Sequence, residues 1–227
     1  MAWLDRYRLR RFTRWVFNSL CTVTCEGQEN IPLTGGCILA TNHLSRLDTP
    51  LLLNLVPRDD LAALVADKYL YNPFFAIFVT TTGSVWINRE SADFSAIRAG
   101  MSIIRKGGIL GIAPEGTRSQ IGELLEAKNG TAMIAEKANV PVITVSISGS
   151  EKAMSELLHF CRPNIHAKFG RPFQLKPISR ENREADLTRN MDEIMCRIAA
   201  NLPENYRGFY KDHPRTLELV NTPENER

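Results

Sequence analysis

Short runs of apolar, often β-branched residues alternate with helical patterns along most of this 227-residue chain. Such alternation is typical of a largely parallel or mixed β-sheet whose faces are covered by helices. The predicted strands are residues 37–41, 61–66, 84–88, 109–113, 142–147 and 165–169. The predicted helices are residues 3–20, 50–56, 68–79, 92–106, 131–138 and 184–201. We therefore expect an α/β fold with a mixed, largely parallel sheet and an additional N-terminal helix.

The length of the chain suits one such domain with short appendages, and two full domains would be cramped. We expect an amphipathic helix at residues 1–22, a main domain at residues 23–210 and a tail at residues 211–227. Pro203, Pro214 and Pro223, together with the polar run 224–227, interrupt any regular pattern near the C-terminus. The tail is therefore predicted to be loosely ordered.

The N-terminal segment places five arginines among aromatic and apolar residues. This pattern predicts an imperfect amphipathic helix that lies on a membrane surface, with its arginines facing anionic lipid. The alternative is a helix that packs on the domain and exposes a solvated basic face. No apolar run approaches the roughly 20 residues that span a bilayer. The arginines are Arg6, Arg8, Arg10, Arg11 and Arg14, and the apolar residues among them are Trp3, Leu4, Tyr7, Phe12, Trp15, Val16 and Leu20.

Net charge and cysteine content exclude several other classes of protein. The formal net charge of +3 is too small to indicate a nucleic-acid-binding protein. The five cysteines are an odd number without CxxC spacing, which argues against a disulfide framework and against a zinc cluster. We expect a reducing compartment and predict no metal site.

The segment from Cys37 to Pro50 reads as a buried strand, a polar turn and the start of a helix at Pro50. It contains His43 and Asp48, five residues apart. Neither a helix nor a strand brings residues at this spacing together, but a turn can. A carboxylate that accepts a hydrogen bond from the N–H of one imidazole nitrogen leaves the other nitrogen as a base. The alternative is an ordinary structural histidine near a helix cap.

Two further segments deliver polar residues at the ends of predicted strands. Residues 113–119 follow the strand 109–113 and combine a glycine turn with Arg118 and hydroxyl groups, which suits a phosphate; the alternative is a surface turn with a Glu115–Arg118 ion pair. The strand 84–88 places Arg89 at its end, where its guanidinium could bind a phosphate monoester. The alternative is a solvated surface charge. Residues 140–149 read as a core strand.

Taken in order, these four segments resemble the sequence blocks of the glycerolipid acyltransferase family, which includes lysophosphatidic acid acyltransferases. The likeness runs from about residue 35 to residue 149. The chain departs from the usual pattern at Ala113, where an aromatic residue commonly precedes the proline, at Thr144, where a second proline is common, and at Trp86, where phenylalanine is more common. These departures bear on the substrate more than on the reaction.

The resemblance implies a role for each matching residue. His43 is the general base and Asp48 orients it, while Arg89 and Arg118 contact the phosphate of the acceptor. Lys68 occupies the position of a family lysine near the active site and is a possible oxyanion or phosphate contact. The remaining substrate-binding residues match the rest of the third block, which is residues 114–119, and these are Glu115, Gly116 and Thr117.

The reaction implied by the resemblance moves a fatty acyl group from acyl-CoA or acyl carrier protein to the free hydroxyl of a lysophosphatidate-type acceptor. It requires no cofactor and no metal, and it implies a peripheral protein at the cytoplasmic face of an anionic membrane. Glycerol 3-phosphate and other lysophospholipids remain alternative acceptors. Two other classes also remain open: a lipid or thioester hydrolase, although the chain lacks a Gly-x-Ser-x-Gly elbow, and a non-enzymatic lipid-binding protein.

Overall fold

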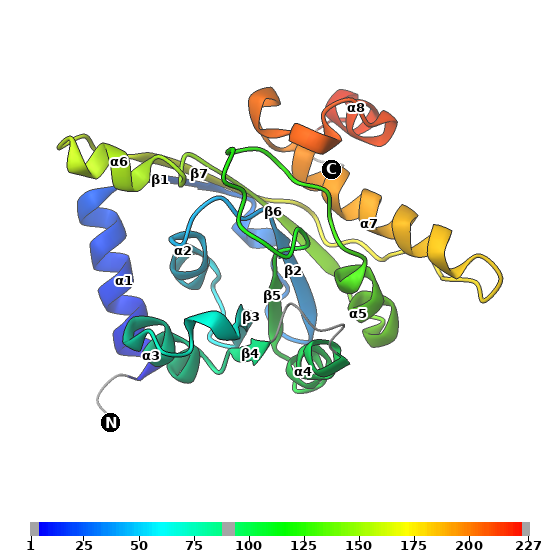
Figure 1. Ribbon diagram of the computed structural model, residues 1–227, viewed down its shortest axis with the longest axis horizontal. Coiled ribbons are helices and arrows are strands. Elements are labelled where there is room, and N and C mark those ends of the chain that lie inside the picture. The colour runs from blue at the N-terminus through cyan, green and yellow to red at the C-terminus, as the bar shows by residue number, and fades with distance from the viewer. Residues whose placement is uncertain (1–4, 88–93, 224–227) are drawn as a thin grey trace.

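The computed structural model of the chain describes residues 5–87 and 94–223 and contains a seven-stranded sheet between two layers of helices (Figure 1). The strands lie in the order β1-β7-β6-β2-β5-β3-β4. All neighbouring strands are parallel except β6 and β7, which pair antiparallel, so the sheet is mixed and largely parallel as predicted. The strands are β1 Thr22–Glu26, β2 Cys37–Thr41, β3 Leu61–Ala66, β4 Val85–Ile87, β5 Ile109–Ile112, β6 Val142–Ser148 and β7 Asn164–Phe169.

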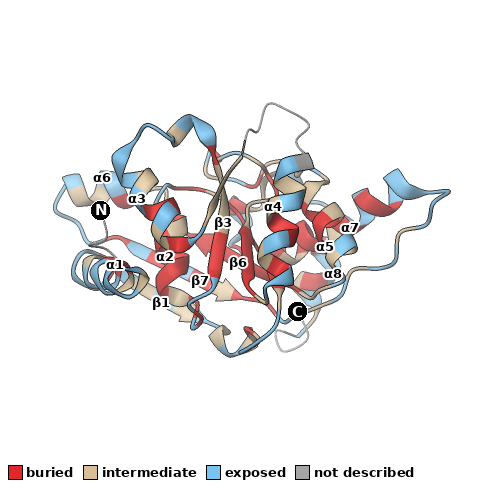
Figure 2. Cartoon of the chain, turned by 90° about the horizontal axis from the view of Figure 1, so that it is seen from below, coloured by how far each residue is buried: buried red, intermediate tan, exposed pale blue. Residues whose placement is uncertain are grey.

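Strand β2 lies at the centre of the sheet and sends alternate side chains to opposite faces. Ile38 and Ala40 join a core cluster with α4, α5 and α7, whereas Cys37 and Leu39 join a second cluster with α1 and α2. Burial on both faces explains why this strand reads as a continuous apolar run. Figure 2 shows the middle of the sheet coloured as buried. The helices are α1 Arg6–Leu20, α2 Asp48–Leu55, α3 Pro73–Thr82, α4 Phe94–Arg105, α5 Gly130–Ala138, α6 Ala153–Leu158, α7 Arg183–Ala200 and α8 Pro214–Asn221.

The register of the sheet determines where the loops after β2, β5 and β6 meet. Ala40 of β2 lies opposite Ile112 of β5 on one side and Thr144 of β6 on the other. Because these three strands are parallel, their C-terminal ends lie at one edge of the sheet. Three loops that are distant in the sequence therefore converge at this edge, where ligands usually bind in such sheets.

Helix α1 is anchored to the domain by apolar residues on one side and by two of its arginines. Leu9 packs with Leu53 of α2 and Phe78 of α3. Arg6 donates a hydrogen bond to the carbonyl of Leu61, and Arg10 donates to the carbonyl of Val56 and to Asp59. Two of the five arginines predicted to face lipid therefore turn toward the protein instead. Among the described residues, no helix is both long enough and apolar enough to cross a membrane.

All six predicted strands are present within a residue or two, although Asn88 lies outside the described residues. Strand β1 was not predicted; it is an edge strand of polar composition with the residues Thr-Val-Thr-Cys-Glu. The helix predicted at residues 68–79 begins only at Pro73, because the side chain of Asn72 caps it by accepting from the backbone N–H groups of Phe74 and Phe75. A short 3₁₀ helix, Asp67–Tyr69, precedes it.

The C-terminal segment differs from the predicted loose tail, because residues Pro214–Asn221 form α8, which packs against α7. Pro214 stands at the start of the helix, where a proline costs no backbone hydrogen bond. Thr216 and Leu219 are buried, and Arg215 forms an ion pair with Glu193 of α7 at 2.7 Å. The fold therefore continues past residue 210. The short helix α6 was also not predicted.

Candidate active site

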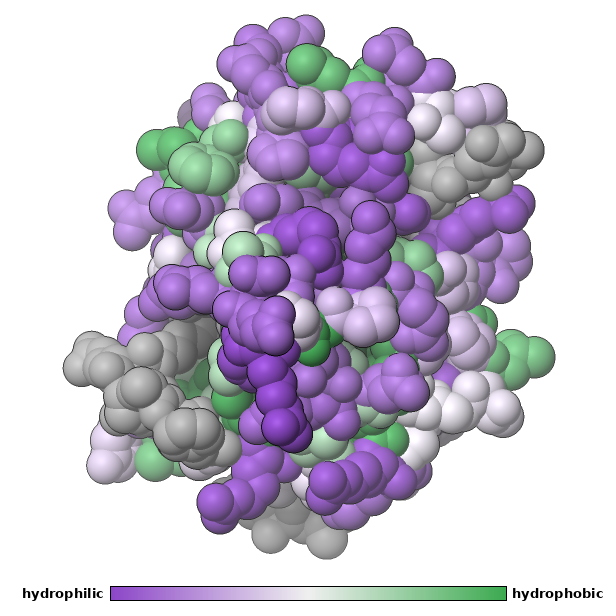
Figure 3. Space-filling view, turned by 90° about the vertical axis from the view of Figure 1, so that its right-hand side faces the viewer, coloured by the Kyte–Doolittle hydropathy of each residue, from purple (hydrophilic) through white to green (hydrophobic). Residues whose placement is uncertain are grey.

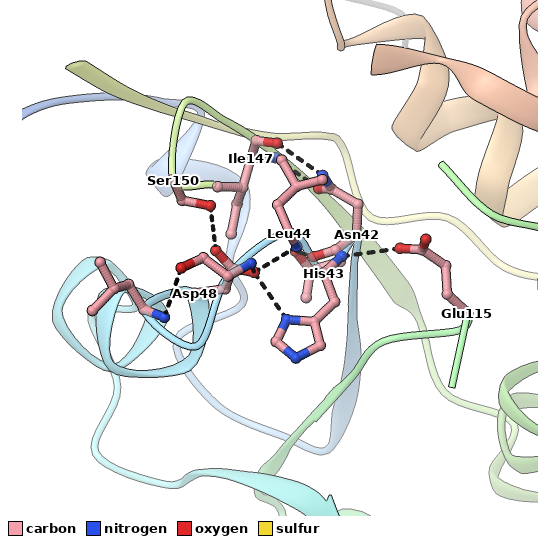
Figure 4. Close-up of polar contacts among 10 residues, drawn as sticks. Asn42, His43, Leu44, Asp48, Glu115, Ile147 and Ser150 are labelled. Atoms are coloured by element: carbon pink, nitrogen blue, oxygen red, sulfur yellow. Dashed lines mark hydrogen bonds and ion pairs between the residues drawn. The ribbon is translucent and has the colours of Figure 1, made fainter. Parts of the chain in front are cut away.

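His43 and Asp48 meet in the turn between β2 and α2, as the sequence predicted (Figure 4). The His43 Nδ1 atom lies 2.9 Å from Asp48 Oδ2, and Asp48 is the first residue of α2. The carboxylate is 1% exposed, whereas the histidine is half-buried. The other ring nitrogen of His43, Nε2, has no hydrogen-bond partner among the described residues. The pair can therefore hold a proton on Nδ1 and leave Nε2 to accept one.

Three donors besides the imidazole surround the buried carboxylate of Asp48. The backbone N–H groups of Leu44 and Ser45 donate to Oδ2 at 2.8 and 2.7 Å, and the hydroxyl of Ser150 donates to Oδ1 at 2.6 Å. These hydrogen bonds compensate the carboxylate for the loss of water. They also fix the plane of the carboxylate and therefore the direction in which it holds His43.

Asn42 ties the turn to the neighbouring strand. Its side-chain amide donates to the carbonyl of Ile147 in β6 at 2.8 Å, and its side-chain oxygen accepts from the Ile147 backbone N–H, also at 2.8 Å. Asn42 is completely buried. Asn42 was not among the predicted site residues. An amide at the end of a buried strand, directly before the histidine, could have indicated its role.

Glu115 is buried beside His43, and burial raises its pKa to about 7. Its Oε1 accepts from the His43 backbone N–H and its Oε2 accepts from the Leu125 backbone N–H, each at 2.9 Å. The ion pair between Glu115 and Arg118, considered as an alternative for this turn, is not among the ion pairs of the described residues. Glu115 was predicted to bind substrate, but in this conformation both of its oxygens hold backbone groups of the protein.

The remaining residues of the third block form an exposed turn next to Glu115. Gly116 adopts a left-handed conformation with φ of 68°, and its N–H donates to the carbonyl of Ala113 at 3.0 Å. Thr117 is exposed, and Arg118 is half-exposed without an ion-pair partner among the described residues. Arg118 is thus available to an anionic ligand near this edge of the sheet.

No contact among the described residues joins Lys68 to His43. Lys68 is exposed in the 3₁₀ helix after β3, and its ammonium lies 5.2 Å from the centroid of the Tyr69 ring. The guanidinium of Arg46, two residues before Asp48, lies 5.8 Å from the same ring. Arg89 lies outside the described residues.

A cavity of about 70 Å³ opens beside the histidine. Apart from His43 and Asp48, most of its wall comes from apolar residues of α2, α3, β3 and β5. An apolar wall suits the hydrocarbon part of a ligand, while the imidazole stands at its polar end. The apolar residues of the wall include Leu52, Leu53, Leu61, Leu64 and Phe78.

A larger groove of about 1,270 Å³ lies along α7 and α8, but it contains none of the predicted site residues. Its charged side chains include Arg197 and Arg215, which both bond Glu193 at 2.7 Å. In the described part of the chain, no three His, Cys, Asp or Glu side chains gather as they would to hold a metal ion. The His43 turn is therefore the candidate active site.

Known proteins match this chain in both sequence and structure. A 1-acyl-sn-glycerol-3-phosphate acyltransferase of Borreliella burgdorferi is 29% identical over 140 residues, which cover 60% of this chain and 54% of that protein. A protein of the same description from Pseudomonas aeruginosa is 26% identical over 141 residues, 60% of this chain and 54% of its own. The chain thus spans about half the length of these curated relatives.

A solved structure shares the fold over a larger part of the chain. The crystal structure of the 1-acyl-sn-glycerophosphate acyltransferase of Thermotoga maritima matches with a TM-score of 0.63 and 27% sequence identity, over 83% of this chain and 78% of that one. The model of the Acyltransferase family matches residues 22–148, from the first residue of β1 to the last of β6. Because this match includes more than half of the chain and the whole turn that joins His43 to Asp48, the chain belongs to the Acyltransferase family.

Proposed function

We propose that this protein transfers a fatty acyl group from an acyl thioester to the free hydroxyl of a lysophosphatidate-type acceptor in phospholipid synthesis. The observation that carries the proposal is the 2.9 Å contact of His43 with a buried aspartate, which leaves the second imidazole nitrogen free beside an apolar cavity. Family membership and the descriptions of the relatives support the same reaction class.

In the proposed mechanism, Nε2 of His43 accepts the proton of the acceptor hydroxyl as its oxygen attacks the thioester carbonyl. The new C–O bond gives a tetrahedral intermediate, which collapses with cleavage of the C–S bond. The departing thiolate takes the proton back from Nε2, so the enzyme returns to its initial state. Asp48 holds the imidazole throughout by its contact with Nδ1. The acceptor itself is the nucleophile, and no acyl-enzyme forms.

Cations around the turn hold the phosphate of the acceptor in this proposal. Arg118 is half-exposed and has no ion-pair partner among the described residues, so it can form a bidentate contact with phosphate. Arg89 supplies a second contact, and Lys68 serves as an oxyanion or phosphate donor. Glu115 acts on the backbone of His43 and not on the substrate, while Gly116 and Thr117 shape the turn that carries Arg118.

The apolar cavity receives the first part of the acyl chain. Its volume of about 70 Å³ is well below the range of about 300–1,000 Å³ that is common for ligand sites. Side chains such as Leu53 and Phe78 must therefore move apart when a long chain enters. The donor is acyl-CoA or acyl carrier protein, and the reaction uses no further cofactor.

We place the protein peripherally on the cytoplasmic face of an anionic membrane, because exposed apolar residues gather at one end of it. Helices α1, α3 and α6 lie together at the left in both cartoon views (Figures 1 and 2). The face at the opposite end is mostly hydrophilic (Figure 3). Arg8, Arg11 and Arg14 are exposed on α1 among aromatic residues, which suits anionic headgroups. The exposed apolar residues at this end are Tyr7, Phe12, Trp15, Tyr71, Phe74, Ile77, Leu158 and Phe160.

One assay tests the reaction directly. Purified protein is incubated with acyl-CoA or acyl carrier protein and with lysophosphatidate, glycerol 3-phosphate or another lysophospholipid, and the products are identified by mass spectrometry. We expect an acylated acceptor whose formation requires both substrates. Free fatty acid released without an acceptor would instead identify a hydrolase, and lipid binding without any product would identify a lipid carrier.

A further inference from the structure

We propose that Ser150 is a positioning residue for the base: it fixes the carboxylate of Asp48, which in turn fixes His43. The inference rests on the proposed function, because it gives Ser150 a role in that reaction. Ser150 is not one of the predicted site residues. Ser150 lies 102 residues after Asp48 in the sequence, and its Oγ is 2.6 Å from Asp48 Oδ1 (Figure 4).

The two oxygens of Asp48 have unequal numbers of donors. Oδ2 accepts from His43 and from two backbone N–H groups, whereas Ser150 is the one donor to Oδ1 among the described residues. Because a carboxylate only accepts, the hydroxyl of Ser150 must be the donor. Without it, Oδ1 would be a buried charged oxygen without a partner, and the carboxylate would rotate or admit water. Either change would alter the geometry at Oδ2, on which the imidazole depends.

The backbone holds Ser150 in place for this contact. Ser150 is completely buried and follows Gly149, which has a φ of 85° at the end of β6. A Cβ atom at position 149 would lie 2.1 Å from the carbonyl oxygen of Asn164 in β7. Only glycine fits there, so the close approach of β7 determines the path by which the chain reaches Ser150. The antiparallel pairing of β6 and β7 is thereby connected to the orientation of the base.

The alternative role for this serine is that of a nucleophile in a hydrolase. A nucleophile would face the free ring nitrogen of the histidine. The Ser150 hydroxyl instead donates to the far oxygen of the carboxylate, on the side of Asp48 away from the ring (Figure 4). Its contacts therefore fit positioning and do not fit covalent catalysis.

The test compares Ser150→Ala with Ser146→Ala. Ser146 is an equally buried serine of β6, but its hydroxyl donates to the carbonyl of Ile198 in α7 at 2.8 Å, away from the site. We expect Ser150→Ala to lower kcat about 10-fold with unchanged KM, on the scale seen when groups that orient a functional imidazole are removed. The acidic limb of its pH profile should move to lower pH, because a carboxylate that has turned away from the ring stabilises the protonated imidazole less. Ser146→Ala should lose stability only.

A double-mutant cycle shows whether Ser150 acts through Asp48. If it does, Ser150→Ala causes no further loss of kcat in an Asp48→Asn protein, because the contact through which it acts is already altered. If the loss of kcat in the double variant equals the product of the losses in the two single variants, the inference is overturned. A folded Ser150→Ala protein with the wild-type kcat and pH profile would also overturn it. Ser150→Cys, which keeps the branching of the side chain but donates only weakly, should show the same loss and replaces Ser150→Ala if the alanine variant fails to fold.

A second measurement does not depend on turnover. The ¹⁵N NMR spectrum of the neutral His43 ring in the wild-type protein should show the proton on Nδ1 and none on Nε2. Ser150→Ala should show a mixture of the two tautomers, and an unchanged spectrum would overturn the inference. If the wild-type protein transfers no acyl group to any acceptor, the proposed function fails, and this spectrum still decides whether Ser150 positions the pair.

Discussion

Glu115 and His43, which lie 72 residues apart in the sequence, are joined by a hydrogen bond of 2.9 Å from the His43 backbone N–H to Glu115 Oε1. A second bond from the same loop, from Ser119 N–H to the His43 carbonyl at 2.8 Å, holds the histidine from its other side. The backbone of His43 is thus fixed by the loop after β5, and its side chain by Asp48. Rigid support of this kind keeps a base within reach of its substrate.

Replacing His43 with alanine should abolish transfer. Because removal of a general base commonly costs 10²- to 10⁴-fold in rate, we expect kcat to fall by about that factor. The side chain is half-buried, and the melting temperature should change little. The exposed His166 offers a matched control, since His166→Ala should retain the wild-type rate. Normal turnover by well-folded His43→Ala protein would remove the histidine from the mechanism.

The buried position of Glu115 predicts a pH-dependent stability. Its pKa is raised from 4.5 to about 7, so between these values the unfolded chain loses the proton while the folded protein keeps it. The free energy of unfolding should therefore fall as the pH rises from 4.5 to 7, by about 3 kcal/mol in all, and should be independent of this group above pH 7.

The control is Glu115→Gln, which cannot ionise. The free energy of unfolding of this variant should not fall between pH 4.5 and 7. It should be lower than that of the wild-type protein at low pH, because the amide NH₂ group faces a backbone N–H and neither can accept. Urea denaturation of both proteins at several pH values measures the difference between them. Parallel curves over the whole range would contradict the prediction.

Removing the guanidinium of Arg118 should weaken binding of the acceptor. A hydrogen bond to a charged group contributes about 1.5–3 kcal/mol, so Arg118→Ala should raise KM for the acceptor about 10- to 100-fold. KM for the thioester should not change. The exposed Arg171, beyond β7, provides the control for loss of one positive charge. Equal effects of Arg118→Ala and Arg171→Ala would show that only the net charge matters.

The apolar end of the molecule should determine membrane binding. Phe160 is fully exposed and has a φ of 58°, a conformation that aspartate tolerates better than phenylalanine. Phe160→Asp should therefore leave the fold intact but weaken sedimentation with anionic vesicles about 10-fold, because one aromatic side chain no longer enters the lipid interface.

Phe209, which is 60% exposed beside α8, is the control at a distance from this end. Phe209→Asp should bind vesicles as the wild-type protein does. Substitution is also a better test than deletion of residues 1–20, because α1 contributes the buried residues Leu9 and Phe17 to the core. If both aspartate variants bind vesicles equally well, α6 does not contact lipid.

The sequence by itself determined the elements whose signals are local. Apolar runs identified the strands of the central sheet, and a histidine after a strand end, followed five residues later by an aspartate, identified the pair of His43 and Asp48. Short-range spacing was sufficient there because one turn places both groups. The edge strand β1, the helix α8 and the true start of α3 were not recovered, since their polar residues and prolines resemble those of loops. Helix α6 was missed because its six residues are too few to show a helical period.

Only the tertiary structure decided which side chains hold His43 and Asp48 in place and which arginines of α1 turn toward the protein. The side chains of Asn42, Glu115 and Ser150 all act across the edge where β2, β5 and β6 end together. The same packing turned Arg6 and Arg10 inward. Local pattern carries information about neighbours in the chain, whereas these partners are 46 to 105 residues apart and are selected by strand order and register. A buried polar group needs a partner, but the sequence does not state which one the fold will bring to it.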